Sequence, residues 1–322
     1  MRYQQKISPI KRSFLQKKSD IISFLYYLNI LRHYGIRKIY QLIKLNKQRN
    51  FKYKLGTVAI IKNEAPYLKE WIEFHKIVGV EIFYLYDNES TDNTKEILQP
   101  YIKQGVVKYE VVKGTGQQIS VYNRAIQRYR NEVQWMAILD ADEFIVPIEY
   151  ETVVQMIESI NQQFSQILIG WLIYGSNGFQ KKPEGLVIEN FNKHADLSFM
   201  AYYKPIINPR LVLNVTFPHW ANVIGKTVDE NGKHLWGYPF ITKKYAMPSS
   251  KSKVRINHYY SKSLEEFLIK SNRGYADYNG SDRSVRDMDA FREHDQNIEV
   301  DNIMNRFYYP LHEILNKKGD RL

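Results

Sequence analysis

The sequence predicts an α/β fold in which a mostly parallel sheet is covered by helices on both faces. Two observations support this prediction. From Leu55 onward, short apolar runs rich in β-branched residues alternate with segments of helical periodicity. The four strands expected first are separated by segments long enough for crossover helices, which parallel strands require. With 322 residues, 44% of them apolar, the chain can bury the core of one large domain.

The first half of this domain is expected to alternate regularly between strand and helix. Strands are assigned where apolar runs are short, and helices where apolar residues recur every three or four positions. Pro66 suits the first turn of a helix, and Ser90 or Asp92 suits a helix cap. The predicted strands are 57–61, 81–86, 106–112 and 135–139, and the predicted helices are 66–78, 91–98 and 117–130.

The pattern becomes less regular after Pro147. There is neither an internal repeat nor a Gly/Ser-rich linker, so residues 55–322 are expected to form one domain after an N-terminal extension, residues 1–54. The later elements expected are a helix at 150–160, a strand at 166–174, a turn at 175–178, strands and loops over 180–255, a helix at 264–272 and an interrupted helix over 281–306.

Polar residues follow three of the predicted strands. Asn63 and Glu64 follow the first strand, Asp87 and Asn88 the second, and the sequence Asp-Ala-Asp at 140–142 the fourth. In open parallel sheets ligands bind beyond the carboxyl ends of the strands. These side chains are therefore expected to line one site.

Asp140 and Asp142 are the strongest candidates for metal binding. In an extended chain, residues i and i+2 point to the same side, so both carboxylates are expected to face one ion. Mn²⁺ or Mg²⁺ needs hard oxygen ligands and leaves positions open for substrate phosphates. The pair therefore suits a diphosphate leaving group whose charge the ion neutralises.

The positive charge of the chain is concentrated at the N-terminus. The formal net charge is +12, yet residues 1–54 hold 14 Lys and Arg against one acid, Asp20, while the remaining residues hold 32 against 33. A nucleic-acid enzyme would spread its positive charge over the surface that follows the phosphates. Nucleic acid is therefore an unlikely partner.

The segment 20–45 is expected to form an amphipathic helix or helix pair. Two interpretations stay open for it: a patch that lies on anionic lipid, or a helix packed on the domain with a solvated basic face. No uncharged run approaches the roughly 20 residues that span a bilayer, and no signal-peptide pattern is present. Without cysteine the chain suits a reducing compartment. We therefore expect a cytoplasmic protein, peripheral to the membrane in the first case.

Several motifs resemble glycosyltransferase family 92, within the GT-A superfamily. They are NEAPYLKEWIEFHKIVGV (63–80), YDNESTDNT (86–94), ILDADEFIVP (138–147), WLIYGSNG (171–178), PHW (218–220) and INHYYSKSLEEFLIKSNRG (256–274). The resemblance covers about 55–310, and the order and spacing of the motifs make it specific. It implies a GT-A catalytic domain, a UDP-sugar donor, a Mn²⁺ cofactor and an inverting transfer. It favours galactose as the sugar, although glucose or an N-acetylhexosamine fits the same residues, and it implies a role in surface-glycan assembly. The basic N-terminal segment without a membrane span suggests a glycan or lipid-linked oligosaccharide as acceptor.

The resemblance also implies roles for individual residues. Asp87 would bind the nucleotide base, in a pocket that Asn63, Glu64 and Asn88 line. Asp140 would hold the ribose or a metal-bound water, and Asp142 would ligate the ion directly. A late histidine often completes the metal site. His258 is the candidate for that ligand, and His219 is its competitor or an acceptor contact.

Further residues are weaker candidates, each with an alternative. Arg124 is either a donor contact or a solvated helix charge, and Trp171 belongs either to the acceptor pocket or to the core. Lys262 and Arg273 are placed where cations could stabilise the diphosphate. An inverting transfer also needs a general base. The sequence leaves that residue open among Glu184, Asp277, Asp282 and Asp287.

Two other functions compete with a glycosyltransferase. A sugar nucleotidyltransferase also uses metal-bound diphosphate, but it usually carries a glycine-rich phosphate loop after the first strand. Residues 62–66 (KNEAP) contain no glycine. A non-catalytic protein that binds nucleotide or glycan is the second alternative, and only an activity measurement separates it from the transferase.

Overall fold

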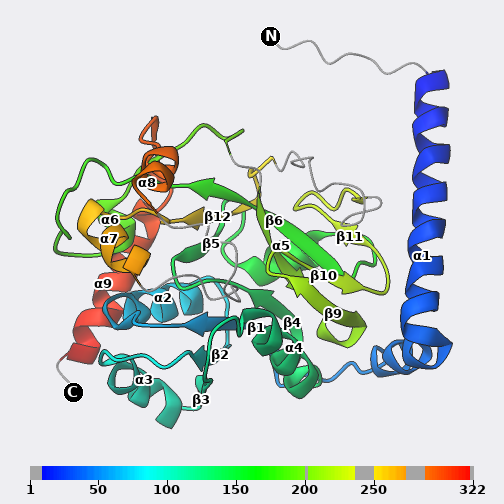
Figure 1. Ribbon diagram of the computed structural model, residues 1–322, viewed down its shortest axis with the longest axis horizontal. Helices are drawn as coiled ribbons and strands as arrows, with labels where there is room; N and C mark the ends of the chain where they lie inside the picture. Colours follow the sequence, from blue (N-terminus) through cyan, green and yellow to red (C-terminus); the bar gives the residue numbers. More distant parts are fainter. Residues whose placement is uncertain (1–8, 200–201, 236–249, 273–286, 320–322) are drawn as a thin grey trace.

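A computed structural model describes residues 9–199, 202–235, 250–272 and 287–319 (Figure 1). Within these residues, nine strands form one mixed sheet. Its strands are β1 (Tyr53–Ile61), β2 (Ile82–Asp87), β3 (Val107–Val111), β4 (Val133–Ile138), β5 (Glu143–Pro147), β6 (Gln166–Ile173), β8 (Tyr203–Ile207), β11 (Thr227–Val228) and β12 (Val254–His258).

The order of the strands confirms the predicted mostly parallel sheet. The order is β3-β2-β1-β4-β8-β6-β12-β5, with β11 beside β6. The first four strands are mutually parallel, whereas β8 runs antiparallel to both β4 and β6, and β5 antiparallel to β12. Two strand pairs lie outside the sheet: β7 (Lys193–His194) with β13 (Glu299–Val300), and β9 (Val212–Phe217) with β10 (Trp220–Val223).

Helices cover both faces of this sheet, as predicted. One core cluster joins the sheet to α2, α3, α5 and α9, and a second joins its other face to α4 and the β9–β10 hairpin. The helices are α1 (Pro9–Leu45), α2 (Ala65–Ile77), α3 (Thr94–Lys103), α4 (Gln118–Tyr129), α5 (Val153–Ser159), α6 (Val187–Asn190), η1 (Pro209–Leu211), α7 (Leu264–Asn272), α8 (Met288–His294) and α9 (Asn305–Gly319).

The interrupted helix predicted over 281–306 is only partly correct within the described residues, because the break after α8 is longer than expected. Helix α8 ends at His294, and residues 295–297 instead bind the turn after β6. The Asp295 carboxylate accepts from the Ser176 backbone at 2.6 Å, and the Asn297 side chain accepts from the Asn177 backbone at 2.7 Å. β13 then pairs with β7, and α9 begins only at Asn305. These long-range bonds explain why local periodicity mispredicts the segment.

Helix α1 begins before the predicted segment and bends at Gly35, whose backbone is not helical (φ 70°). It packs on the β9–β10 hairpin: the Tyr26 hydroxyl donates to the Val223 carbonyl at 2.9 Å, and the Tyr34 hydroxyl donates to the Asn214 side chain at 2.8 Å. In Figure 1 it stands at one edge of the molecule. Among the described helices, none is both long and apolar enough to cross a bilayer.

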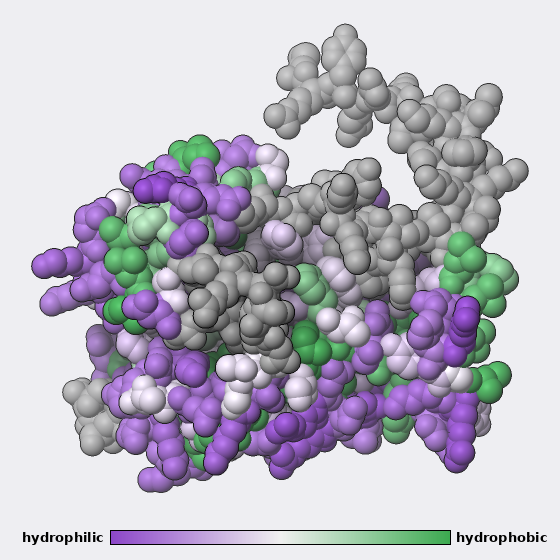
Figure 2. Space-filling model, in the orientation of Figure 1, coloured by the Kyte–Doolittle hydropathy of each residue, from purple (hydrophilic) through white to green (hydrophobic). Residues whose placement is uncertain are grey.

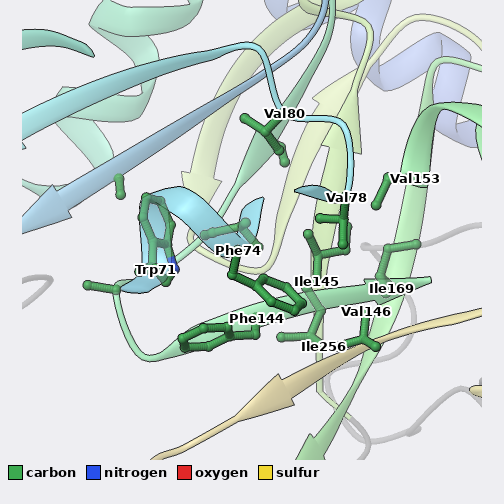
Figure 3. Packing of buried hydrophobic residues seen from close by; sticks show 14 of the residues in the cluster. Trp71, Phe74, Val78, Val80, Phe144, Ile145, Val146, Val153, Ile169 and Ile256 are labelled. Carbon is green, nitrogen blue, oxygen red and sulfur yellow. The ribbon is translucent and has the colours of Figure 1, made fainter. Parts of the chain in front are cut away.

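Helix α2 fixes the position of β5, the strand that follows Asp142. The Trp71 indole donates to the Glu143 carbonyl at 2.8 Å, and the His75 Nε2 accepts from the Ile145 backbone at 3.2 Å. Phe74 packs edge-on against Phe144 with ring centroids 5.1 Å apart (Figure 3). The turn before β5 is thereby held by a rigid, fully buried layer.

His75 is expected to make the fold sensitive to acid. Its Nδ1 lies 2.7 Å from the Trp71 carbonyl, so the neutral ring donates there and accepts from Ile145. Burial lowers the pKa of His75 to about 3, against a hydrogen bond to Trp71 that raises it. The unfolded value is about 6.5. The contribution of neutral His75 to the free energy of unfolding is therefore complete above pH 6.5. Below that pH it falls by about 1.4 kcal/mol per pH unit.

The check is urea unfolding of wild type and His75→Gln at pH 6.5 and pH 5. Glutamine can donate and accept at the same two positions without titrating. Between pH 6.5 and pH 5 we expect the free energy of unfolding of wild type to fall by about 2 kcal/mol more than that of the variant. His33→Gln, at an exposed position on α1, is the control and should behave as wild type. Equal acid losses in wild type and His75→Gln would contradict the prediction.

Candidate active site at the carboxyl edge of the sheet

The polar residues that follow β1, β2 and β4 meet at one edge of the sheet, as expected. Ile61, the last residue of β1, is in register with Asp87, and Val58 is in register with Ile138 at the end of β4. Hydrogen bonds tie the first two loops together. The Asn63 side chain accepts from the Thr91 backbone at 2.7 Å, and the Asn63 backbone donates to the Ser90 hydroxyl at 2.9 Å.

Asp87 lies in the centre of this first half of the site. One oxygen accepts from the Ser90 backbone at 2.8 Å, and the other from the Tyr109 hydroxyl at 2.5 Å. The Asn88 amide donates to the carbonyls of Val112 and Gly114. Glu64, a buried residue, occupies the N-cap of α2. The four predicted base-pocket residues therefore adjoin one another, and Asn88 also shapes the loop after β3.

The chain around Asp140 and Asp142 forms a turn, which corrects the expected extended geometry. β4 ends at Ile138, and the Glu143 backbone donates to the Asp140 carbonyl at 3.1 Å. The two carboxylates therefore do not project from neighbouring same-side positions of a strand. They still lie close enough that each raises the pKa of buried Glu143. The turn arises because the Glu143 side chain folds back and accepts from the Asp140 backbone at 2.9 Å.

Asp140 is held by residues from two elements. Its Oδ1 accepts from Gln118 at 3.1 Å and from the Tyr122 hydroxyl at 3.2 Å, both on α4. Its Oδ2 accepts from the Lys204 ammonium at 2.7 Å, on β8. Burial would raise the pKa of Asp140, but Lys204 brings it below its usual value. Burial raises the pKa of Glu143 well above its usual value, although Lys204 lies 3.5 Å away.

Asp142 contacts two basic side chains. Its Oδ2 accepts from the ammonium of Lys270 on α7 and lies 3.6 Å from the Nε2 of His258 on β12. Burial opposes ionisation, yet Lys270 and His258 bring the pKa of Asp142 well below its usual range. Register places His258 opposite Glu143, and the Tyr259 backbone donates to the Asp142 carbonyl at 2.9 Å. The predicted late histidine is thus beside the second aspartate.

Asp142 and His258 fit a divalent ion as a pair. Two ligands of one Mn²⁺ or Mg²⁺ ion lie roughly 3–4 Å apart, which matches the 3.6 Å between Oδ2 and Nε2. Among the described residues, no three His, Asp or Glu side chains form a metal-holding group, so phosphates and water would supply the other ligands. The Oδ2 of Asp142 also accepts from Lys270, so the ion would have to take the place of that contact. Both oxygens of Asp140 accept hydrogen bonds, from two different elements. Asp140 is therefore suited to bind either a water on the ion or the ribose, rather than the ion itself.

Lys262 adds positive charge near Asp142. It is a buried residue with a left-handed backbone (φ 49°), and its ammonium lies 3.6 Å from the centre of the Tyr67 ring. Its charge helps to lower the pKa of Asp142. Three lysines at positions 204, 262 and 270 therefore surround the two carboxylates. Such a group suits a site that receives a diphosphate.

The predicted acceptor residues line the site beside His258. Trp171 on β6 lies with its ring centroid 4.3 Å from that of His258 and 4.9 Å from that of His219. The Tyr202 ring packs against both Trp171 and His219. Burial, with Lys204 nearby, lowers the pKa of His219 to about 3, so its ring is neutral. Trp171 is buried, and its indole nitrogen has no hydrogen-bond partner among the described residues.

Two other predicted residues lie away from these carboxylates. Arg124 is exposed on α4 and donates to Glu110 at 2.7 Å, whereas Gln118 and Tyr122 of that helix reach Asp140. Glu184 is exposed in the loop before α6. Among the other candidates, the Asp287 carboxylate caps α8, and Arg273, Asp277 and Asp282 lie outside the described residues.

Lys204 and Lys270 are the site residues that sequence reasoning missed. Lys204 is 64 positions from Asp140, and Lys270 is 128 positions from Asp142. A signal was present for both. Lys204 interrupts the apolar strand YKPII, and Lys270 lies three positions after Phe267, on the buried face of α7. A lysine at a core position is rarely buried without a partner.

The sheet, with its acidic turn after β4 and its antiparallel β8, has the mixed α/β topology expected of a GT-A glycosyltransferase. The chain belongs to glycosyltransferase family 92, whose profile matches residues 58–298. This confirms the family that the motifs indicated.

The curated relatives are plant proteins. A glycosyltransferase family 92 protein of Arabidopsis thaliana is 30% identical over 117 residues, which cover 36% of this chain and 20% of the relative. One of Ricinus communis is 23% identical over 231 residues, covering 70% and 39%. The galactan β-1,4-galactosyltransferase GALS3 of Arabidopsis thaliana is 28% identical over 135 residues, covering 38% and 26%. The chain thus spans less than half the length of these relatives.

Solved structures show a more distant likeness. Residues 1–349 of S. aureus TarS are 15% identical, with a TM-score of 0.38, covering 70% of this chain and 67% of that one. The same segment in complex with UDP is 17% identical, with a TM-score of 0.34, covering 49% and 47%. At such scores, the fold assignment depends on the family match and on the sheet topology.

Proposed function

We propose that the protein transfers a hexose, with inversion, from a UDP-sugar to a hydroxyl group of a glycan or lipid-linked oligosaccharide. The observation that carries the proposal is the pairing of Asp142 with His258 at the carboxyl edge of the sheet, among three lysines. Galactose is the favoured sugar because two of the curated relatives are named galactan β-1,4-galactosyltransferases.

Mn²⁺ or Mg²⁺ is proposed as the cofactor, held by Asp142 and His258. When bound, the ion neutralises the charge that develops on the diphosphate leaving group. The chain's own residues do the rest. Lys204 keeps Asp140 ionised, and Asp140 would hold the ribose. Lys262 is placed to bind phosphate oxygens.

The nucleoside would bind beside Asp87. The β1 and β2 loops, joined through Asn63 and Ser90, form a pre-organised rim there. The acceptor would bind on the opposite side, against Trp171 and His219. A neutral His219 and an aromatic face suit the weakly polar C–H face of a sugar.

The test is UDP release from UDP-galactose by the purified chain with Mn²⁺, in the absence of acceptor. We expect slow release that EDTA stops and added Mn²⁺ restores. UDP-glucose and UDP-N-acetylglucosamine serve as competing donors and decide the sugar. A nucleotidyltransferase would instead form pyrophosphate from UTP and a sugar 1-phosphate. No release from any UDP-sugar, by a protein that binds UDP, would identify a non-catalytic scaffold and overturn the proposal.

We also propose that the protein works at the cytoplasmic face of a membrane. The N-terminal segment carries the net positive charge, and apolar side chains of α1 remain exposed although the helix packs on the domain. Anionic lipid attracts such a basic amphipathic segment by about 1 kcal/mol per cation. The two interpretations of this segment are compatible, because one face of α1 packs inward and another faces solvent.

A further inference from the structure

A cavity lies at the opposite end of the sheet from the carboxylates. This junction cleft, of about 810 Å³, lies between α1 and the edge of the sheet where β4 and β6 begin. Gln134 and Trp135, near the start of β4, line it, whereas Asp140 follows the end of that strand. The strand from Gln134 to its last residue, Ile138, is roughly 13 Å long, and Asp140 lies beyond that end. The junction cleft is therefore distinct from the proposed donor site.

The lining of the junction cleft is positively charged. Arg49, Arg210 and Lys226 line it, and no Asp or Glu is among its described lining residues. Buried Arg210 donates only to backbone carbonyls, 2.7–3.0 Å away, and its Nε has no hydrogen-bond partner among the described residues. Burial, together with Arg49, lowers the pKa of Arg210 to about 10.

The neighbouring cations likewise have neutral partners. Arg49 donates to two backbone carbonyls, and Lys226 donates to the Gln162 side chain at 3.5 Å. Arg210 is buried without a counter-charge, which is costly, whereas Arg49 and Lys226 are exposed. An anion in the junction cleft would therefore offset the charge of Arg210 and be attracted by the other two.

The rest of the wall combines amide side chains with aromatic and apolar ones. The Trp135 and Phe164 rings stack with centroids 4.9 Å apart, and the Phe51 ring lies 4.1 Å from the Arg210 guanidinium. Tyr27 and Ile43 complete the wall from α1, on either side of the bend at Gly35.

The same two residues belong to the exposed apolar face of α1. Tyr27 is 43% exposed and Ile43 46%. Figure 2 shows hydrophobic residues gathered at the edge of the molecule where α1 lies. Over residues 24–45, where the side chains of the helix are described, the other exposed apolar residues are Phe24, Leu25, Leu28, Leu31, Ile36 and Tyr40. The junction cleft thus continues into the exposed apolar face of α1, which is suited to contact the hydrocarbon chains of lipids.

We propose that the junction cleft binds the phosphate head group of an anionic membrane lipid, whose chains lie along the exposed face of α1. Arginine and lysine with neighbouring amide donors are suited to phosphate oxygens. The proposal rests on the proposed membrane contact but goes beyond it, because it assigns one site with a preference for phosphate. General attraction to a charged surface would show no such preference.

The experiment compares flotation of the full chain with two kinds of anionic vesicle, both based on phosphatidylcholine, which is itself neutral. One kind contains phosphatidic acid and the other contains oleate, at equal surface charge. Only the first kind offers a phosphate monoester. We expect wild type to bind the phosphatidic acid vesicles about tenfold more tightly. Arg49→Gln/Lys226→Gln, at two exposed positions of the cleft, should abolish this preference.

Arg32→Gln/Arg37→Gln is the matched control, since it removes the same charge from α1 outside the cleft. It should weaken binding to both vesicles and keep the tenfold preference. Wild type without a preference, or a cleft variant that keeps it, would overturn the proposal. Inorganic phosphate that abolishes the preference while raising the melting temperature would reassign the site to soluble phosphates. UDP release is measured without vesicles, so failure of the proposed transferase is separately visible.

Discussion

Replacing Asp142 with asparagine is expected to lower the rate of sugar transfer by about a thousandfold. A divalent ion contributes several kcal/mol to stabilising a leaving diphosphate, and about 4 kcal/mol corresponds to three orders of magnitude in rate. Asparagine keeps the size of the side chain, but removes the charge that pairs with His258 and Lys270. The measurement is UDP-galactose turnover with saturating Mn²⁺.

A second variant separates loss of function from loss of fold. Asp142→Asn leaves the buried Lys270 ammonium without its carboxylate, which destabilises the protein. Adding Lys270→Met removes the ammonium that had paired with Asp142. We expect the double variant to recover most of the lost melting temperature and none of the lost activity. Wild-type turnover by either folded variant would contradict the assignment of Asp142.

Lys204→Met is expected to destabilise the fold by about 3 kcal/mol, because it leaves Asp140 and Glu143 without their shared cation. The lysine side chain is 1% exposed and Glu143 is fully buried, so water cannot take the place of the ammonium between the two carboxyl groups. Methionine retains the volume of the lysine stem, which limits the change to electrostatics. Urea unfolding at pH 7 measures the difference.

The control for this variant is Lys54→Met, which breaks an ion pair between half-exposed side chains, Lys54 and Glu158. Exposed pairs contribute less than about 1 kcal/mol, so this variant should unfold close to wild type. If Lys204→Met were as stable as the control, the carboxylates would not depend on the lysine. Transfer activity should also fall, since Lys204 keeps Asp140 ionised.

The fold was predictable because its signals are local. The apolar runs that became β1, β2 and β4 are short and separated by clear helical periodicity, and Leu264–Asn272 agrees with the predicted helix. The wrong predictions of secondary structure concern segments whose conformation depends on contacts with distant parts of the chain. Residues 295–297 leave the helical pattern because they bind the turn at 176–177, which no local pattern reveals.

The site could be predicted only in part, for the same reason. Asp87, Asp140 and Asp142 stand next to strand ends, and the motif context pointed to His258. The lysines that set their charge come from β8 and α7, far along the chain, and only the packing of these elements brings them together. The turn at 140–142 was also missed, because it depends on the Glu143 side chain folding back.

We propose that Asp142 and His258 hold a divalent ion that meets the diphosphate of a nucleotide-sugar. The anomalous scattering of manganese in a crystal soaked with MnCl₂ and UDP reports the position of that ion. We expect one strong anomalous peak within bonding distance of Asp142 Oδ2 and His258 Nε2, next to the diphosphate and with the base near Asp87. UDP bound without such a peak, or manganese bound elsewhere, would contradict it.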